Sequence, residues 1–246
     1  MSAPGPLPSR QSSVSELLEH SSQLFKRALP ACLPLAMIAM LMALLPSLYW
    51  QLGGRGPMRE LPRDPIYWLL YALGLATYLW LLGALLLRLR SLRAGAARSL
   101  PEELRVAAAL WPSLLAASLL SALLIFAGLM LLIIPGVYVA ICMVPLSAVV
   151  MYESSPPLVA LRRSFALVRG LWLKCFACVL IGALVVMICI FTAGLVASLL
   201  IAIFTAAGTA AATALSTAAM LLVLAAALVF FTALSLTIYS AASSSA

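Results

Sequence analysis

The final part of this chain lacks charged side chains altogether. From Cys175 to Ala246, 72 consecutive residues include no Asp, Glu, Lys, Arg or His. A helix crosses a bilayer with about 20 apolar residues, so this stretch alone is long enough for at least two crossings. Charged residues make up 9% of the sequence and hydrophobic residues 65%, whereas soluble domains average about 25% and about 45–50%. A water-soluble fold is excluded, and the sequence predicts an all-α polytopic membrane protein.

Histidine and acidic residues are scarce, which argues against an enzyme. The sequence has one histidine, His20, and seven Asp and Glu residues, without the cluster that a hydrolytic or metal site needs. We expect His20 to lie on a solvated helix surface beside Glu19. No catalytic residue, metal or cofactor is predicted. The apolar spans also lack an ionisable residue at mid-depth, which disfavours a proton- or ion-coupled transporter.

The five cysteines all lie in apolar segments and form neither a disulfide framework nor a zinc pattern. Cys175 and Cys178 have C-x-x-C spacing near the start of a predicted span. Either they pack as two small residues on one helix face, or they form a redox pair whose only nearby cation is Lys174.

Six apolar runs predict six transmembrane helices within a membrane domain at 28–239. A polar segment with an amphipathic helix precedes it at 1–27, and an uncharged tail follows at 240–246. The first run starts too late and is too long for a cleaved signal peptide, so we interpret it as a retained membrane helix. The predicted spans are 28–49, 66–87, 113–134, 137–152, 171–195 and 217–239.

Two of these boundaries carry special features. A tight turn at Pro135–Gly136 is expected to join the third and fourth spans. The fourth span is short, about 24 Å against a hydrocarbon core of about 30 Å, and Pro145 should kink it. The stretch 192–216 forms extensions of two long helices, a re-entrant piece or an extra crossing, so 175–246 crosses either two or three times.

Basic residues are unevenly divided between the two sides that these spans define. One side, which includes the N-terminus, carries twelve Lys and Arg residues, and the other carries only Arg55, Arg59 and Arg63. The positive-inside rule then predicts a cytoplasmic N-terminus. A net charge of +8 would indicate nucleic acid for a soluble protein. Beside apolar spans it indicates the anionic headgroups of membrane lipids, and no nucleic-acid partner is predicted.

Each predicted cytoplasmic segment begins with a signal for a short helix that leads into a membrane hairpin. Segments 18–24 and 161–167 also share the pattern Leu-x-x-Ser-x-x-Leu. Either two amphipathic helices are similar by chance, or the chain contains three repeats of an interfacial helix plus a hairpin. The start signals are two capping boxes and a Ser-Pro pair, at Ser13–Glu16, Ser99–Glu102 and Ser155–Pro156.

The third of these segments has the clearest amphipathic pattern. On a helical wheel, four apolar residues form one stripe: Leu158, Leu161, Phe165 and Val168. Either this stripe lies in the acyl boundary with the neighbouring arginines at lipid phosphates, or the helix is a connector with its apolar side on the bundle. The candidate contacts for lipid headgroups are Arg162, Arg163 and Arg169.

An ordered motif runs through the second half of the chain. Ile134–Tyr138 reads Ile-Pro-Gly-Val-Tyr, and a proline, a glutamate and then Ala-Leu-x-Arg-Ser-x-x-Leu-x-x-Gly follow. The motif positions are Pro135, Gly136, Pro145, Glu153, Ala160, Leu161, Arg163, Ser164 and Gly170. This motif, sharp over Ile134–Lys174, resembles the YciC-like family of bacterial inner-membrane proteins. That family is grouped with the membrane domain fused to some glycerophosphoryl diester phosphodiesterases. The resemblance implies a six-helix inner-membrane protein.

Glu153 is the most informative single residue of this motif. A carboxylate at the acyl boundary is unfavourable without a partner. After the corner at 154–157, Arg163 or Arg162 is the expected partner in a structural ion pair. A lipid-headgroup site is the alternative.

Small residues are spaced for close helix approach at Ala72-x-x-x-Ala76, at Ala193-x-x-x-Ala197 and around Gly208. They indicate either generic packing, or the face of a homo-oligomer, a membrane-protein partner or a lipid-accessible groove. The whole sequence predicts a non-enzymatic integral membrane protein that binds lipid or assists envelope organisation. A small-solute or lipid transporter and an accessory subunit of a larger membrane complex are the alternatives.

Overall fold

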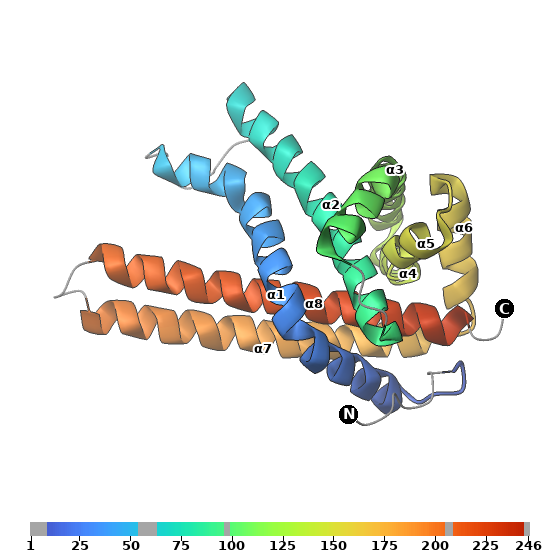
Figure 1. The fold of residues 1–246 in the computed structure, drawn as a ribbon. Helices are drawn as coiled ribbons and strands as arrows, with labels where there is room; N and C mark the ends of the chain where they lie inside the picture. Colours follow the sequence, from blue (N-terminus) through green and yellow to red (C-terminus); the bar gives the residue numbers. More distant parts are fainter. Residues whose placement is uncertain (1–8, 54–62, 96–98, 205–208, 244–246) are drawn as a thin grey trace.

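The chain folds into packed helices, among which α7 and α8 form a long antiparallel pair (Figure 1). The computed structural model describes residues 9–53, 63–95, 99–204 and 209–243. Every regular element within these ranges is an α-helix. The helices are α1 (Val14–Leu52), α2 (Pro65–Ala94), α3 (Leu100–Leu131), α4 (Ile133–Cys142), α5 (Leu146–Glu153), α6 (Pro157–Val168), α7 (Trp172–Phe204) and α8 (Thr209–Ser243).

Within the described residues, six helical stretches are long and apolar enough to cross a membrane, which confirms the predicted fold class. Five of these stretches each lie in one helix, and the remaining one, the fourth along the chain, combines α4 and α5. Large apolar side chains point outward, with Leu131 76% exposed and Phe191 73% exposed. Such surfaces are stable in lipid but not in water. The stretches are Val14–Trp50, Pro65–Ala94, Leu100–Leu131, Ile133–Glu153, Trp172–Val196 and Thr217–Ser243.

The first two predicted interfacial helices are not separate elements. Each continues without a break into a membrane span, in α1 and in α3. The capping box of α1 forms as predicted, because Ser13 N donates to Glu16 Oε2 at 3.0 Å and Glu16 N donates to Ser13 Oγ at 3.3 Å. The side-chain bonds predicted for the second capping box do not form. Ser99 is the N-cap residue of α3 but makes no side-chain capping bond.

The turn between α3 and α4 lies at Leu132, so the prediction of a turn at Pro135–Gly136 is wrong. Leu132 has an extended backbone, and Pro135 lies in the first turn of α4. Backbone N–H groups in the first turn of a helix have no hydrogen-bond partner within the helix, so proline is tolerated there. Gly136 instead permits close packing of α4 on α3. A Cβ atom at Gly136 would lie 2.8 Å from the backbone nitrogen of Leu129. Only glycine fits at this crossing.

The fourth span is interrupted just before Pro145, where the sequence predicts only a kink. The helix α4 ends at Cys142, and Pro145 is the N-cap residue of α5. Since proline has no backbone N–H, carbonyl groups at the break need other donors. Ser164 Oγ on α6 donates to the Cys142 carbonyl at 2.6 Å, and Ser235 Oγ on α8 donates to the Val144 carbonyl at 2.9 Å. Two hydroxyl groups from other helices therefore hold the break.

A separate helix, α6, forms where the third short helix is predicted, but its buried face differs from the predicted stripe. Leu161 and Val168 are buried as expected, whereas Leu158 is 64% exposed. Ala160, Ser164 and Leu167 complete the buried face, which packs against the bundle. The helix starts at Pro157, and Pro156 is its N-cap residue. The structure thus favours the alternative in which one face of this helix lies on the bundle.

The C-terminal half of α8 lies at the centre of the bundle. Val229, Leu234 and Ile238 are at most 1% exposed, and α8 contributes residues to both hydrophobic core clusters. It contacts α1, α2, α5, α6 and α7. An uncharged helix is suited to this position because burial of an unpaired charge would be strongly unfavourable.

Candidate functional site

Basic residues of the described chain gather at one end of the bundle, where α2, α5 and α8 end and α3, α6 and α7 begin. Lys174 Nζ at the start of α7 donates to the carbonyl groups of Arg10 and Ser12 at 2.9 and 3.1 Å. The N-terminal segment therefore lies at this same end. Arg63 precedes the other end of α2, about 45 Å away at 1.5 Å per residue. Arg55, Arg59 and Arg98 lie outside the described residues.

Glu153, the last residue of α5, pairs with Arg163 of α6. The Glu153 Oε1 atom lies 3.4 Å from Arg163 Nε and accepts a hydrogen bond from the Tyr239 hydroxyl at 3.0 Å. Ser154 makes the corner with a left-handed φ of 49°. Of the two expected partners, Arg163 is therefore the one that pairs. The side chains of Arg163 and Glu153 are 37% and 27% exposed, so the pair lies at a partly solvated boundary.

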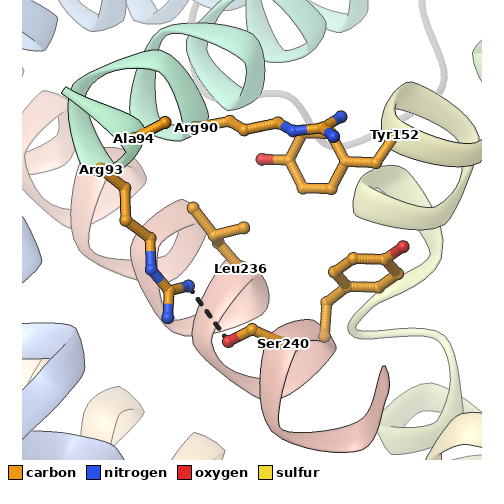
Figure 2. Close-up of a pocket in the computed structure, with 7 residues that line it drawn as sticks. Arg90, Arg93, Ala94, Tyr152, Leu236 and Ser240 are labelled. Carbon is orange, nitrogen blue, oxygen red and sulfur yellow. Dashed lines mark hydrogen bonds between the residues drawn. The ribbon is translucent and has the colours of Figure 1, made fainter. Parts of the chain in front are cut away.

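Beside this corner, a pocket opens between the C-terminal ends of α2, α5 and α8 (Figure 2). Its volume is about 320 Å³, within the lower part of the range for small-molecule sites, about 300–1,000 Å³. Two arginines, two tyrosines and a serine supply its polar groups. Its lining residues are Arg90, Arg93, Ala94, Tyr152, Leu236, Tyr239 and Ser240.

Neutral groups hold both guanidinium groups of the pocket. Arg90 lies over the Tyr152 ring, 4.7 Å from its centroid, and the Tyr152 hydroxyl donates to the Leu86 carbonyl at 2.8 Å. Arg93 Nη1 donates to Ser240 Oγ at 3.1 Å. Among the described residues, neither arginine forms an ion pair with a carboxylate. The pocket therefore keeps a positive charge that its own walls do not neutralise.

A second carboxylate, Glu103, is buried between α2 and α3 and is 1% exposed. Its Oε1 atom accepts from Ser91 Oγ at 2.6 Å, and its Oε2 atom lies 3.5 Å from Arg88 Nη1. Trp80 Nε1 donates to the Leu104 carbonyl at 3.0 Å and adds another link between these helices. A buried ion pair needs such additional hydrogen bonds to offset its desolvation. We interpret this cluster as a clamp between α2 and α3.

The motif residues serve mainly to build the corner. Ala160, Leu161 and Ser164 form the buried face of α6, and Gly170 has a φ of 86°, a conformation that strongly favours glycine. Arg162 and Arg169 are exposed and form no ion pair within the described part of the chain. The motif thus explains the position of Glu153 and Arg163, while the other two arginines face outward.

The remaining predicted features take structural positions. Cys175 and Cys178 are 2% and 0% exposed and are both free thiols, as the packing alternative expects. His20 is half-buried, with Nδ1 at 2.8 Å from the Glu16 carbonyl oxygen, so the expected solvated position is only partly right. Ala72 is exposed, and it is Gly74 that approaches the Met42 carbonyl of α1. Gly208 and the side chain of Ala197 lie outside the described residues.

Five residues at this end were not singled out from the sequence. Arg90 and Arg93 counted only as flanking charges, although their spacing of three residues places them on one face of α2. Tyr239 and Ser240 occur in the uncharged segment and carried no pattern. Glu103 directly follows Glu102, the residue assigned to the capping box. Its spacing of four and eleven residues from the buried Ala107 and Leu114 places all three on the face of α3 that points into the bundle. That spacing is the signal that could have found it.

Comparisons of the chain with protein-family models, with curated proteins and with solved structures give no match. The resemblance to the YciC-like family therefore stays a prediction that rests on the motif. The fold and the site define a class directly: an all-α protein with six candidate membrane spans and an arginine-lined pocket at its basic end.

Proposed function

We propose that this protein is a non-enzymatic component of the bacterial inner membrane that binds anionic lipid headgroups and assists envelope organisation. Its basic end would face the cytoplasm, in accordance with the positive-inside rule. The observation that carries the proposal is a set of arginines at this end that form no ion pair with any described carboxylate. They are Arg90, Arg93, Arg162 and Arg169.

Electrostatics supports a lipid ligand for these arginines. Each basic residue near an anionic membrane surface contributes about 1 kcal/mol of attraction. That contribution is as large as an exposed ion pair typically provides, about 0–1 kcal/mol. Arginines without internal partners therefore gain most from contact with lipid phosphates.

The outward side of α6 supports contact with the interface. Leu158 and Val159 are 64% and 54% exposed, and Arg162 lies one turn from Leu158. A helix that offers apolar side chains beside an arginine suits the boundary between acyl chains and headgroups. The opposite face of α6 packs on the bundle, so its exposed face stays directed away from the bundle.

Native mass spectrometry of the purified full-length chain would test the proposal. After exposure to equal amounts of phosphatidylglycerol and phosphatidylethanolamine, we expect adducts enriched in phosphatidylglycerol. A variant with glutamine at all four arginines should lose this enrichment. The matched control is Arg63→Gln, which removes one basic charge at the other end of α2 and should retain it. Equal binding of the two lipids by the unmodified protein would contradict the proposal.

Catalysis is not part of the proposed function. His20 is the only histidine of the sequence, and its ring nitrogen bonds to the backbone of α1. We expect no hydrolysis of glycerophosphodiesters by the purified protein. Metal-dependent turnover that is lost in His20→Ala would show that the protein is an enzyme.

Transport of a small solute or lipid is the second candidate, and the buried Glu103–Arg88 pair favours it. Ionisable groups within membrane helices often mark transport paths. However, Glu103 lies in the first turn of α3 at the basic end of the bundle, and it already accepts bonds from Ser91 and Arg88. Uptake into liposomes that depends on pH and is abolished by Glu103→Gln would favour transport over lipid binding.

A further inference from the structure

We propose that the pocket between α2, α5 and α8 is a specific site for the phosphate group of an anionic lipid headgroup, bound by Arg90 and Arg93. This inference rests on the proposed function for the class of ligand. It goes further by assigning recognition to two residues outside the family motif and outside α6.

Both arginines project from the last turns of α2 toward the other two helices. Figure 2 shows Arg90 reaching across to the ring of Tyr152, and Arg93 reaching to Ser240, with Leu236 between them. Residues three positions apart lie on the same helix face, so their guanidinium groups border one space. Both arginines line the same pocket, so an anion bound in it would lie close to two positive charges.

The contacts that hold these guanidinium groups leave donors available. A guanidinium has five N–H donors in a planar fork, which matches the oxygens of a phosphate. Arg90 faces an aromatic ring, and Arg93 donates one hydrogen bond to a neutral hydroxyl, that of Ser240. Side chains that are already positioned lose little freedom when a ligand binds, which favours affinity.

The carboxylate at the neighbouring corner, Glu153, has a cation of its own. Glu153 Oε1 accepts from the Tyr239 hydroxyl and lies 3.4 Å from Arg163 Nε. Arg163 therefore balances this negative charge at the corner. The positive charge of Arg90 and Arg93 remains for a ligand.

The lining of the pocket suits an amphiphile. Leu236 lies one helical turn before Ser240 on α8, so an apolar wall adjoins the polar groups along that helix. A volume of about 320 Å³ accommodates a headgroup, while the acyl chains of the same lipid would stay in the bilayer. A free phosphate ester offers the same anionic chemistry, and the test below separates the two sources.

Helix ends offer a competing explanation for the two arginines. The C-terminus of a helix carries a partial negative charge, and three helices end here, so Arg90 and Arg93 would stabilise these ends even without a ligand. In that case their replacement would lower thermal stability and leave lipid affinity unchanged. The two explanations therefore predict different measurements.

The experiment uses the full chain in a neutral detergent, with dissociation constants measured by microscale thermophoresis. The lipid probe is short-chain phosphatidylglycerol, and the soluble probes are glycerol 3-phosphate and inorganic phosphate. The double variant R90Q/R93Q should weaken binding of the lipid at least about tenfold, because each lost charge-assisted bond accounts for roughly a factor of ten. Ala94→Leu, which fills the pocket from an exposed position and keeps both charges, should weaken it similarly.

The matched control is K26Q/R27Q, which removes the same charge from exposed positions on α1 and should bind within about twofold of the unmodified protein. Melting temperatures of all variants show whether they are folded.

Lower thermal stability of R90Q/R93Q with unchanged lipid affinity would support the helix-end explanation and overturn the inference, and four further results would also overturn it. Equal weakening in R90Q/R93Q and K26Q/R27Q would indicate bulk charge alone. Loss of binding only when Arg162 and Arg169 are replaced would place the lipid on α6 and leave the proposed function standing. Glycerol 3-phosphate or inorganic phosphate binding as tightly as the lipid would make a soluble phosphate the ligand. No lipid binding by the unmodified protein would refute the proposed function as well.

Discussion

Ser164→Ala is the sharpest test of how the broken fourth span is held together. The Ser164 hydroxyl, fully buried, is a hydrogen-bond donor to the Cys142 carbonyl at the end of α4. Its removal leaves this carbonyl unsatisfied, since Pro145 removes an N–H from the following segment. A buried group without its partner costs about 1–3 kcal/mol. Bonds between membrane helices average less, about 0.6 kcal/mol, because unfolded states find other partners. A carbonyl fixed at a proline break has few alternatives, so we expect about 1–2 kcal/mol.

The assay is thermal unfolding in detergent, followed by tryptophan fluorescence. For chains of about 150–250 residues, 1 kcal/mol shifts the melting temperature by about 2–4 °C, so Ser164→Ala should lower it by about 2–8 °C. Amide exchange should also increase between Cys142 and Pro145. The control is Ser121→Ala, which removes a half-buried hydroxyl bonded to the Ser118 carbonyl within α3 and should have little effect. If both variants melt at the same temperature, the hydroxyl does not support the break and the reasoning is refuted.

Three further predictions concern the corner, the α3–α4 crossing and the topology. In the same melting assay, Arg163→Ala should destabilise the protein more than Arg169→Ala, by about 1 kcal/mol because the Glu153–Arg163 pair is partly exposed. Glu153→Gln should destabilise it less than Arg163→Ala. The opposite order of effects would reject the pairing. Gly136→Ala should destabilise by about 1–3 kcal/mol through overpacking against α3, and an unchanged denaturation midpoint would show that the crossing can open. A fluorescent protein fused after Ser243 should fold in the cytoplasm, whereas an active periplasmic reporter there would indicate an odd number of crossings.

Local chemistry made several features predictable from the sequence. The six spans follow from the length and apolarity of the runs, and a kink at Pro145, where the structure has a full break, follows from the missing N–H of proline. The Glu153–Arg163 pair was predictable because a short corner limits how far the carboxylate can reach. The spans and the break depend on local sequence, and the two residues of the ion pair are only ten positions apart.

The errors arose where packing decides between local alternatives. Pro135 suits a turn and also the first turn of a helix, and the close contact of Gly136 with α3 selects the second. The face of α6 is set by the helices that it meets, so Ser164 is buried although it is polar. The pocket was beyond prediction because Arg93 and Ser240 are 147 residues apart in sequence and meet only through the arrangement of α2 and α8.

The central position of α8 also constrains how this protein is assembled during synthesis. The other described helices precede α8 in the chain and are synthesised before it. Until α8 arrives, the faces of α1 and α2 that it covers have only lipid as a partner, and the broken span lacks the hydroxyl of Ser235. Apolar faces tolerate that delay because lipid is as apolar as their eventual neighbour. Among the described helices, packing would therefore be completed in one late step, in which a single uncharged helix completes both core clusters and one wall of the pocket together.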